Sequence, residues 1–268
     1  MNILRISKAA TAFSFFGVGC AWLSLVQMPA IRLRGGTERE VTMRSQDAVR
    51  RGFTFFMDCV RFAGLVNYDP RSHRPEVPEG PFVLVANHPT LIDVIAVTAS
   101  HERSVCIAKN SYFRSRALGP LLRQCAYVDG GDQGPAAIER NVEEGLARIR
   151  EGYPLLVFAE GTRSPPGEML RFGRLAFEIA SRAGVPVVPV YVEANPPMLT
   201  KGLPWYRFPS EFVQYRLTQL PPVEVKPGRR GAREAMAEVE RLLRKRVEAA
   251  RGAPNPPQPE SANLETAR

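Results

Sequence analysis

Short apolar runs that alternate with helical patterns constrain the fold of this chain more than any other feature. The runs occupy residues 82–86, 105–108, 126–128, 155–159, 185–192, 212–217 and 223–225. Helical periodicity covers 136–152 between the third and fourth runs and 170–184 between the fourth and fifth, and each helical segment ends in glycine. Strands that alternate with helices predict an α/β fold with a mostly parallel central sheet flanked by helices.

The segment from Ala9 to Ile31 indicates contact with a membrane. It carries no charged side chain, and its length is close to the ~20 apolar residues that cross a bilayer. A cleaved signal peptide is the alternative, but the segment is long for one and no clear cleavage site follows it. Arg5 and Lys8 precede the segment and arginines also follow it, so charge asymmetry sets no orientation. A full span and a shallow or re-entrant anchor both remain open.

Residues 46–66 predict a second N-terminal helix with one apolar face. The face consists of Val49, Phe53, Phe56, Val60 and Ala63. It either packs on its own domain or lies at a membrane surface, with neighbouring arginines at the level of the headgroups.

These patterns divide the chain into five parts. We expect a membrane-associated helical module at 1–66, a Pro-rich linker at 67–81 and the α/β domain at 82–228. A basic helix at 229–251 is most simply solvated or facing headgroups, and the tail at 252–268 has the composition of disorder.

Composition narrows the possible partners. The net charge of +9 suits nucleic acid, an anionic bilayer, or an acidic protein or substrate. Nucleic acid is the weakest of these, because the aromatic residues cluster in core-like and membrane-like segments. The four cysteines form no CxxC pair and are expected to be reduced, and with only three histidines no metal site is expected.

Polar residues stand where the predicted strands end. Ligands of parallel α/β sheets bind outside the carboxyl ends of the strands, so these residues should gather at one rim. They are Asn87 and His88 after the first strand, Lys109 after the second, Asp129 after the third, and Glu160, Gly161, Thr162 and Arg163 after the fourth.

The stretch NHPTLID, at residues 87–93, admits two roles for its aspartate. His88 and Asp93 can meet only if His88 precedes a helix and Asp93 lies in its first turn. Pro89 favours that break, and Thr90 is a good N-cap with Asp93 at the capping-box spacing, as the third helical residue. A carboxylate partner would also hold one imidazole nitrogen and raise the basicity of the other, which makes a general base. The two roles are compatible.

The stretch FAEGTRS, at residues 158–164, offers an anion site. Arg163 can form a bidentate bond to phosphate or carboxylate, and Gly161 lets the backbone approach an anion, although Glu160 and Arg163 could instead pair with each other. No serine or cysteine stands in an evident nucleophile elbow. A base and an anion anchor at one rim therefore predict attack by the hydroxyl of an anionic acceptor on an activated carbonyl. A thioesterase or lipid hydrolase, and a membrane-binding protein without catalysis, are the competing hypotheses.

Between residues 82 and 192 the chain resembles the glycerolipid acyltransferases typified by 1-acylglycerol-3-phosphate acyltransferase. NHPTLID is similar to the NHxxxxD motif of that family, FAEGTRS to its EGTR motif, and VPVVPVYV to its final proline-containing apolar block. The resemblance implies that His88 is the general base and that Asp93 orients it. It further implies that the acceptor is bound by Asn87, Lys109, Glu160, Gly161, Thr162 and Arg163.

The resemblance also implies the substrates. The donor would be an acyl thioester of coenzyme A or acyl carrier protein, and the acceptor a lysophospholipid, with no cofactor, metal or covalent acyl-enzyme. The enzyme would meet its lipids at a membrane, at the cytoplasmic face of a bacterial inner membrane.

One block departs from the family pattern. Gly130 stands where the family often has an arginine that assists the anionic acceptor. Lysophosphatidate, which would give phosphatidate, is the expected acceptor, and another lyso-lipid such as a lyso-aminolipid is the alternative. Arg123 or Lys109 are candidates to replace the missing arginine.

Overall fold

The computed structural model describes residues 3–68, 77–131, 135–204, 206 and 208–251. Most of the predicted linker, at 69–76, and the predicted disordered tail at 252–268 lie outside the described residues.

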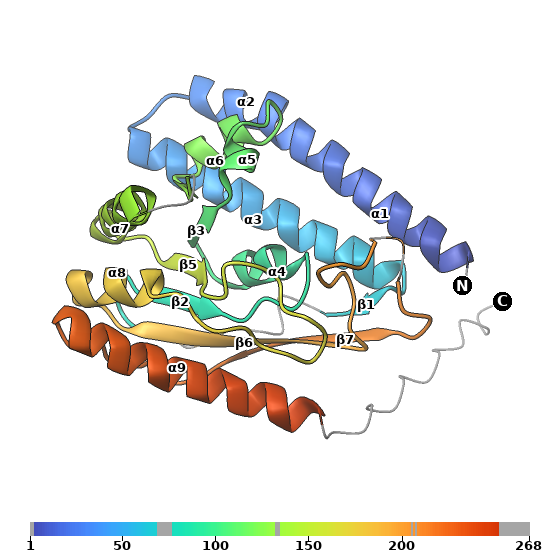
Figure 1. Ribbon diagram of the computed structural model, residues 1–268. Coiled ribbons are helices and arrows are strands. Elements are labelled where there is room, and N and C mark those ends of the chain that lie inside the picture. Colours follow the sequence, from blue (N-terminus) through green and yellow to red (C-terminus); the bar gives the residue numbers. More distant parts are fainter. Residues whose placement is uncertain (1–2, 69–76, 132–134, 205, 207, 252–268) are drawn as a thin grey trace.

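A seven-stranded sheet in the order β1-β7-β6-β2-β5-β3-β4 forms the centre of the described chain (Figure 1). The five strands from β6 to β4 are mutually parallel, whereas β7 runs antiparallel to β6 and β1 pairs in parallel with β7. The strands are β1 (Val66–Asn67), β2 (Val83–Ala86), β3 (Val105–Ala108), β4 (Val128–Asp129), β5 (Leu155–Phe158), β6 (Val187–Asn195) and β7 (Val213–Gln219).

The predicted α/β class is confirmed, with two differences in the strands. Residues 223–225 do not form a strand; Val223 makes only an isolated antiparallel bridge to Val187. Val66 and Asn67, assigned by sequence to the end of the helical module and to the linker, instead form the edge strand β1. Two residues are too few to show the alternation by which a strand is recognised.

Helices cover both faces of the sheet. On one face lie α7 (Pro135–Arg150), α8 (Leu175–Ala183) and α9 (Gly228–Arg251); on the other lie α3 (Glu38–Phe62) and α4 (Asp93–Ser100) (Figure 1). Two short helices, α5 (Asn110–Phe113) and α6 (Gly119–Gln124), connect β3 with β4. Helix α8 begins later than its predicted segment and ends where expected, at Gly184, whose left-handed φ of 66° suits glycine.

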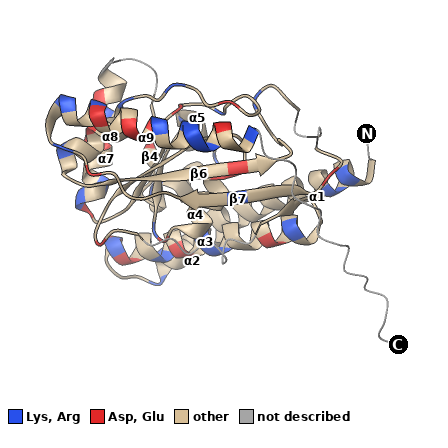
Figure 2. Cartoon of the chain, turned by 90° about the horizontal axis from the view of Figure 1, so that it is seen from below, with Lys and Arg blue, Asp and Glu red and all other residues tan. Residues whose placement is uncertain are grey.

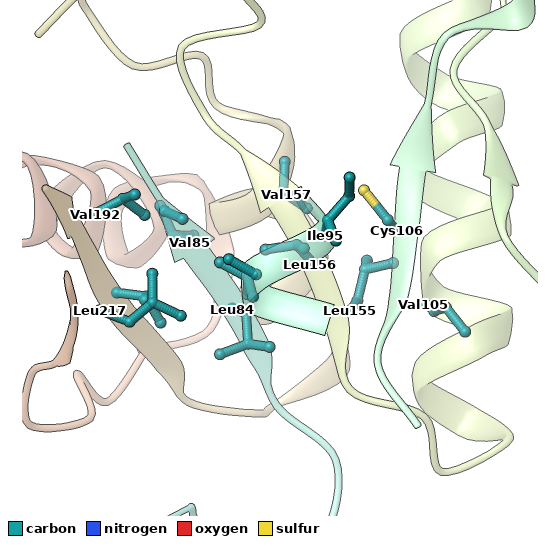
Figure 3. Packing of buried hydrophobic residues seen from close by; sticks show 14 of the residues in the cluster. Leu84, Val85, Ile95, Val105, Cys106, Leu155, Leu156, Val157, Val192 and Leu217 are labelled. Atoms are coloured by element: carbon teal, nitrogen blue, oxygen red, sulfur yellow. The ribbon is translucent and has the colours of Figure 1, made fainter. Parts of the chain in front are cut away.

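The core lies between the sheet and these helices (Figure 3). Leu84, Leu155 and Leu156 are fully buried, and Ile95 of α4 packs over them. Because both faces of the sheet are covered, the central strands are continuously apolar rather than alternating. The four cysteines are free thiols, as predicted, and burial raises the pKa of Cys106 to about 12, which keeps that thiol protonated.

The N-terminal helices pack against the α/β domain. Helix α1 (Ile3–Trp22), the π-helix η1 (Leu23–Gln27) and α2 (Met28–Leu33) form one helical run that is long and apolar enough to cross a membrane. The run is held near both ends: Arg5 donates to the carbonyl of Glu211 at 2.7 Å, and Gln124 donates to the carbonyl of Met28 at 3.0 Å.

Helix α3 lies between α1 and α4 (Figure 1). Val49, Phe56 and Val60 of its predicted apolar face are buried, and Phe53 and Ala63 are half-buried against the core. The first of the two interpretations of this face, packing on its own domain, therefore holds. Phe55 and Phe62, which lie outside that pattern, are exposed.

The C-terminal helix was expected to be solvated or to face headgroups, and this expectation is wrong. One side of α9 packs on α8 and β6, and its buried residues include Ala235, Val239, Leu243 and Val247. Their spacings of four are those of an apolar helical stripe. The many charged residues between them conceal it in the sequence, and in Figure 2 the rest of α9 carries both basic and acidic residues.

Candidate active site

His88 and Asp93 meet at the end of β2. Nδ1 of His88 lies 2.8 Å from Oδ2 of Asp93. Helix α4 begins at Asp93, two residues later than the capping-box pattern predicts, because the residues before it form a turn. The amide of Thr90 donates to Asp93 Oδ2 at 2.7 Å, and the amide of Ile92 donates to Thr90 Oγ1 at 3.2 Å. One carboxylate thus holds both the turn and the imidazole.

The Asp93 carboxylate is fully buried and accepts further hydrogen bonds. The hydroxyl of Tyr215, on β7, donates to Oδ1 at 2.7 Å, and the hydroxyl of Thr90 donates to the same oxygen. Burial, followed by the nearby Asp93 charge, raises the pKa of Tyr215, so its hydroxyl stays protonated and able to donate. Sequence reasoning missed Tyr215, which is 122 residues from Asp93 and belongs to no recognisable motif.

Glu160 braces the loop beside His88. Its carboxylate accepts the backbone amide of His88 at 2.9 Å, the hydroxyl of Ser164 at 2.7 Å and the amide of Leu170 at 2.6 Å. The amide of Ser164 in turn donates to the carbonyl of His88 at 2.8 Å. Glu160 was expected to contact the acceptor, but its carboxylate is buried and engaged within the protein. No ion pair with Arg163 occurs among the described residues, so the pairing alternative is wrong.

Asn87 was also expected to bind the acceptor, and the structure gives its side chain a different position. The side-chain nitrogen of Asn87 donates to the carbonyl of Val192 at 2.8 Å, and the side-chain oxygen of Asn87 accepts the backbone N–H of Val192 at 2.7 Å. Asn87 is buried, so these bonds extend the pairing of β2 and β6 past the end of the ladder and hold the backbone that enters His88.

The imidazole of His88 has one face covered and one nitrogen available. The ring stacks on Phe158, the last residue of β5, with centroids 4.2 Å apart and planes 27° apart. The side chain is 19% exposed, and Nε2 has no hydrogen-bond partner in the described part of the chain. Phe158 lies within the FAEGTRS stretch, but sequence reasoning assigned it no role.

The remaining predicted acceptor ligands differ in their surroundings. Gly161 is exposed at φ +69°, with open space above it, and Thr162 and Arg163 are half-buried beside it. One guanidinium nitrogen of Arg163 donates to the carbonyl of Leu199 at 2.7 Å, which orients the group and leaves other N–H donors for an anion. Lys109 is exposed at the end of β3, with β5 between it and His88.

The turn at Gly130 and Gly131, which departs from the family pattern, lies beside Arg140 of α7. A Cβ on Gly131, at φ +64°, would lie 1.9 Å from a guanidinium nitrogen of Arg140, so glycine here lets the α7 arginine lie on the turn. Arg123, one candidate replacement, donates to the carbonyl of Phe113 at 2.9 Å. Among the described residues, no group of three or more His, Cys, Asp or Glu side chains could hold a metal ion.

Residues 65–193 match the family model described as Acyltransferase. The chain is 26% identical over 197 residues to 1-acyl-sn-glycerol-3-phosphate acyltransferase beta of Homo sapiens, a match that covers 70% of this chain and 67% of that one. It is 31% identical over 129 residues to a 1-acyl-sn-glycerol-3-phosphate acyltransferase of Chlamydomonas reinhardtii, with 47% and 38% covered. The matched region is similar to the glycerolipid acyltransferases, as its motifs predicted.

The family likeness extends to the fold. The crystal structure of the 1-acyl-sn-glycerophosphate acyltransferase PlsC of Thermotoga maritima superposes with a TM-score of 0.68, at 21% identity, over 96% of this chain and 100% of that one. The chain spans 38% and 67% of the lengths of the two curated relatives above. The matched region ends within β6, so β7 and Tyr215 lie outside the family model.

Proposed function

We propose that this protein transfers a fatty acyl group from an acyl thioester to the hydroxyl of a lysophospholipid, most simply 1-acyl-sn-glycerol 3-phosphate, giving phosphatidate. The observation that carries the proposal is the His88–Asp93 pair, with Nδ1 held at 2.8 Å by a buried carboxylate and Nε2 open at the rim. The names of the curated relatives support the acceptor, since they are acyltransferases of 1-acyl-sn-glycerol 3-phosphate.

The chemistry follows from this arrangement. Nε2 of His88 takes the proton of the acceptor hydroxyl as that oxygen bonds to the thioester carbonyl carbon. The carbon–sulfur bond then breaks, and the departing thiolate receives the proton from His88. Asp93 holds the Nδ1–H tautomer throughout, so no covalent acyl-enzyme is required.

Cations beside this centre would hold the acceptor phosphate. Arg163 is the first of them, because its guanidinium is already oriented by Leu199 and lies on the same loop as Glu160. Lys109 and Arg140 add positive charge farther along the rim. Coenzyme A and acyl carrier protein remain the two candidate carriers of the donor.

The location that suits this activity is the surface of a membrane, at the cytoplasmic face of a bacterial inner membrane. The helical run from α1 to α2 is bonded to the α/β domain near both ends, through Arg5 and Met28, so it cannot leave the domain to cross a bilayer without breaking those contacts. An apolar helix held in this way suits partial insertion beside the domain.

Acyl transfer from a labelled acyl thioester to lysophosphatidate tests the proposal. His88→Ala should lower the rate by a factor of about 10² to 10⁴, the usual contribution of a general base. An unchanged rate in this variant would overturn the mechanism, provided that circular dichroism shows both proteins folded.

The same assay separates the alternatives. If the donor is consumed equally fast without acceptor, the protein is a thioesterase; if no donor is consumed while vesicles are bound, it is a lipid-binding protein without catalysis. A screen with lysophosphatidate and a lyso-aminolipid as competing acceptors decides which hydroxyl is acylated.

A further inference from the structure

An apolar groove lies between the first helical run and α3. It has a volume of about 470 Å³, within the ~300–1,000 Å³ usual for ligand sites. Aromatic pairs join its walls: Phe16 lies 4.8 Å from Phe56 and 6.3 Å from Phe53, and Phe15 lies 5.8 Å from Phe55, between ring centroids. Of the two glycines that line it, Gly19 on α1 leaves open space, since a Cβ there would meet no atom within 4 Å, whereas Gly52 on α3 lies against the side chain of Leu23.

The groove is separate from the candidate active site. It lies on the side of α3 that faces α1, whereas α4, which begins with Asp93, packs on α3 from the direction of the sheet (Figure 1). A ligand here would therefore be neither the acyl group in transfer nor the acceptor at His88.

The surroundings of the groove match a phospholipid. Val18 and Trp22, which line the groove, are 67% and 53% exposed, and Leu25 of the same helical run is 63% exposed. Such a surface is covered by lipid when the protein lies on a bilayer. Arg51 is the one cation that lines the groove, and it makes no hydrogen bond or ion pair within the described ranges of the chain.

We propose that this groove binds one acyl chain of an anionic membrane phospholipid, with the lipid phosphate at Arg51. The acyl chain would fill the space between α1 and α3 and supply contacts that the α1 face with Gly19 does not make with α3. The bound lipid would hold α1 against α3, and hence the first helical run against the domain.

Trp22, which lines the groove, can report the lipid directly. In a Trp205→Phe background Trp22 is the remaining tryptophan of the chain, which has two. Purified full-length protein is titrated, in detergent micelles, with a phosphatidylglycerol whose acyl chains carry bromine, and Trp22 fluorescence is measured. We expect saturable quenching at about one lipid per protein.

Two glycine variants form a matched pair. A Cβ on Gly17 or on Gly19 meets no atom within 4 Å, but only Gly19 lines the groove. Gly19→Leu should fill the space and weaken saturable quenching about tenfold, the effect of displacing about two buried methylenes. Gly17→Leu should leave it unchanged. Arg51→Gln should remove a preference of up to about fivefold for phosphatidylglycerol over phosphatidylcholine.

The outcomes are distinguishable. Equal, unsaturable quenching in all variants would mean general contact with the micelle and would overturn the site. Dimers in sedimentation that Gly19→Leu abolishes would assign the groove to a second copy instead. Because quenching is measured without donor or acceptor, its result does not depend on the proposed acyl transfer.

Discussion

Asp93 serves two purposes with one carboxylate. A buried charge is tolerated when its oxygens are satisfied, and here the donors are the Thr90 amide and hydroxyl, the Tyr215 hydroxyl and the His88 imidazole. These bonds fix the orientation of the carboxylate, and the carboxylate fixes the orientation of His88. The NHxxxxD spacing therefore places the residues of the turn as well as those of the proposed catalytic pair.

Tyr215→Phe tests whether this support matters for the reaction. Loss of a hydrogen bond to a charged group costs about 1.5–3 kcal/mol, so we expect a fall in stability of that order and a kcat about tenfold lower, with KM for the donor little changed. Steady-state kinetics and urea unfolding measure both effects. Tyr68→Phe is the matched control, because its hydroxyl lies 2.6 Å from Ser100 rather than at Asp93. A kcat equal to that of the wild type would show that Asp93 is positioned without Tyr215.

At the scale of elements, α4 and α9 show how helix ends and faces couple to the sheet. Helix α4 starts at Asp93 and ends against His101, whose Nδ1 lies 3.0 Å from the carbonyl of Val97. Helix α9 closes the other face, and Arg244 reaches the carbonyl of Met169 in the loop that Glu160 braces. Helix α4 thus supplies Asp93 to the site, and α9 supports the neighbouring loop from outside the site.

His101, at the end of α4, should make the stability of the protein depend on pH. Burial lowers the pKa of His101 from its usual 6.5. The unfolded chain therefore binds a proton at His101 at a pH where the folded protein does not. The free energy of unfolding is therefore not reduced by His101 above about pH 6.5, and it falls as the pH drops towards the lowered pKa of the folded state. Thermal unfolding between pH 7.5 and 5 should show this loss, and His101→Gln should flatten it. A slope unchanged by the substitution would assign the dependence to other groups.

The apolar side of α9 should contribute strongly to stability. Leu243 is fully buried, so Leu243→Ala should cost about 2–5 kcal/mol in urea unfolding. Lys245→Ala, on the exposed side of the same helix, should change stability by less than about 0.5 kcal/mol. Similar small effects at both positions would support the sequence prediction of a solvated helix.

At the scale of the whole molecule, charge and apolar surface act together. We propose that the net charge of +9 attracts the protein to an anionic bilayer and that the exposed apolar residues of α1, η1 and α3 enter it. Charge attraction is screened by salt, with a Debye length of about 10 Å at 0.1 M and about 3 Å at 1 M, whereas apolar burial is not.

Co-sedimentation with vesicles separates the two contributions. Binding to anionic vesicles should exceed binding to zwitterionic ones, and raising the salt to 1 M should remove that excess while leaving measurable binding to both. Complete release at high salt would mean that the apolar helices do not enter the bilayer.

The sequence by itself determined the α/β class, most strands and the meeting of His88 with Asp93. These features depend on periodicity and on steric rules that act over a few residues. The apolar side of α9 could also have been found from its spacing, but its charged neighbours obscured it.

Only the tertiary structure decided which polar groups are free and which are engaged. Asn87 and Glu160 carry the residue types of a binding site, yet their partners are Val192 and the His88 loop, which the fold brings to them. Tyr215 reaches Asp93 across 122 residues, and the groove between α1 and α3 exists only because two helices pack side by side. Such contacts depend on the path of the whole chain, and local patterns carry no information about that path.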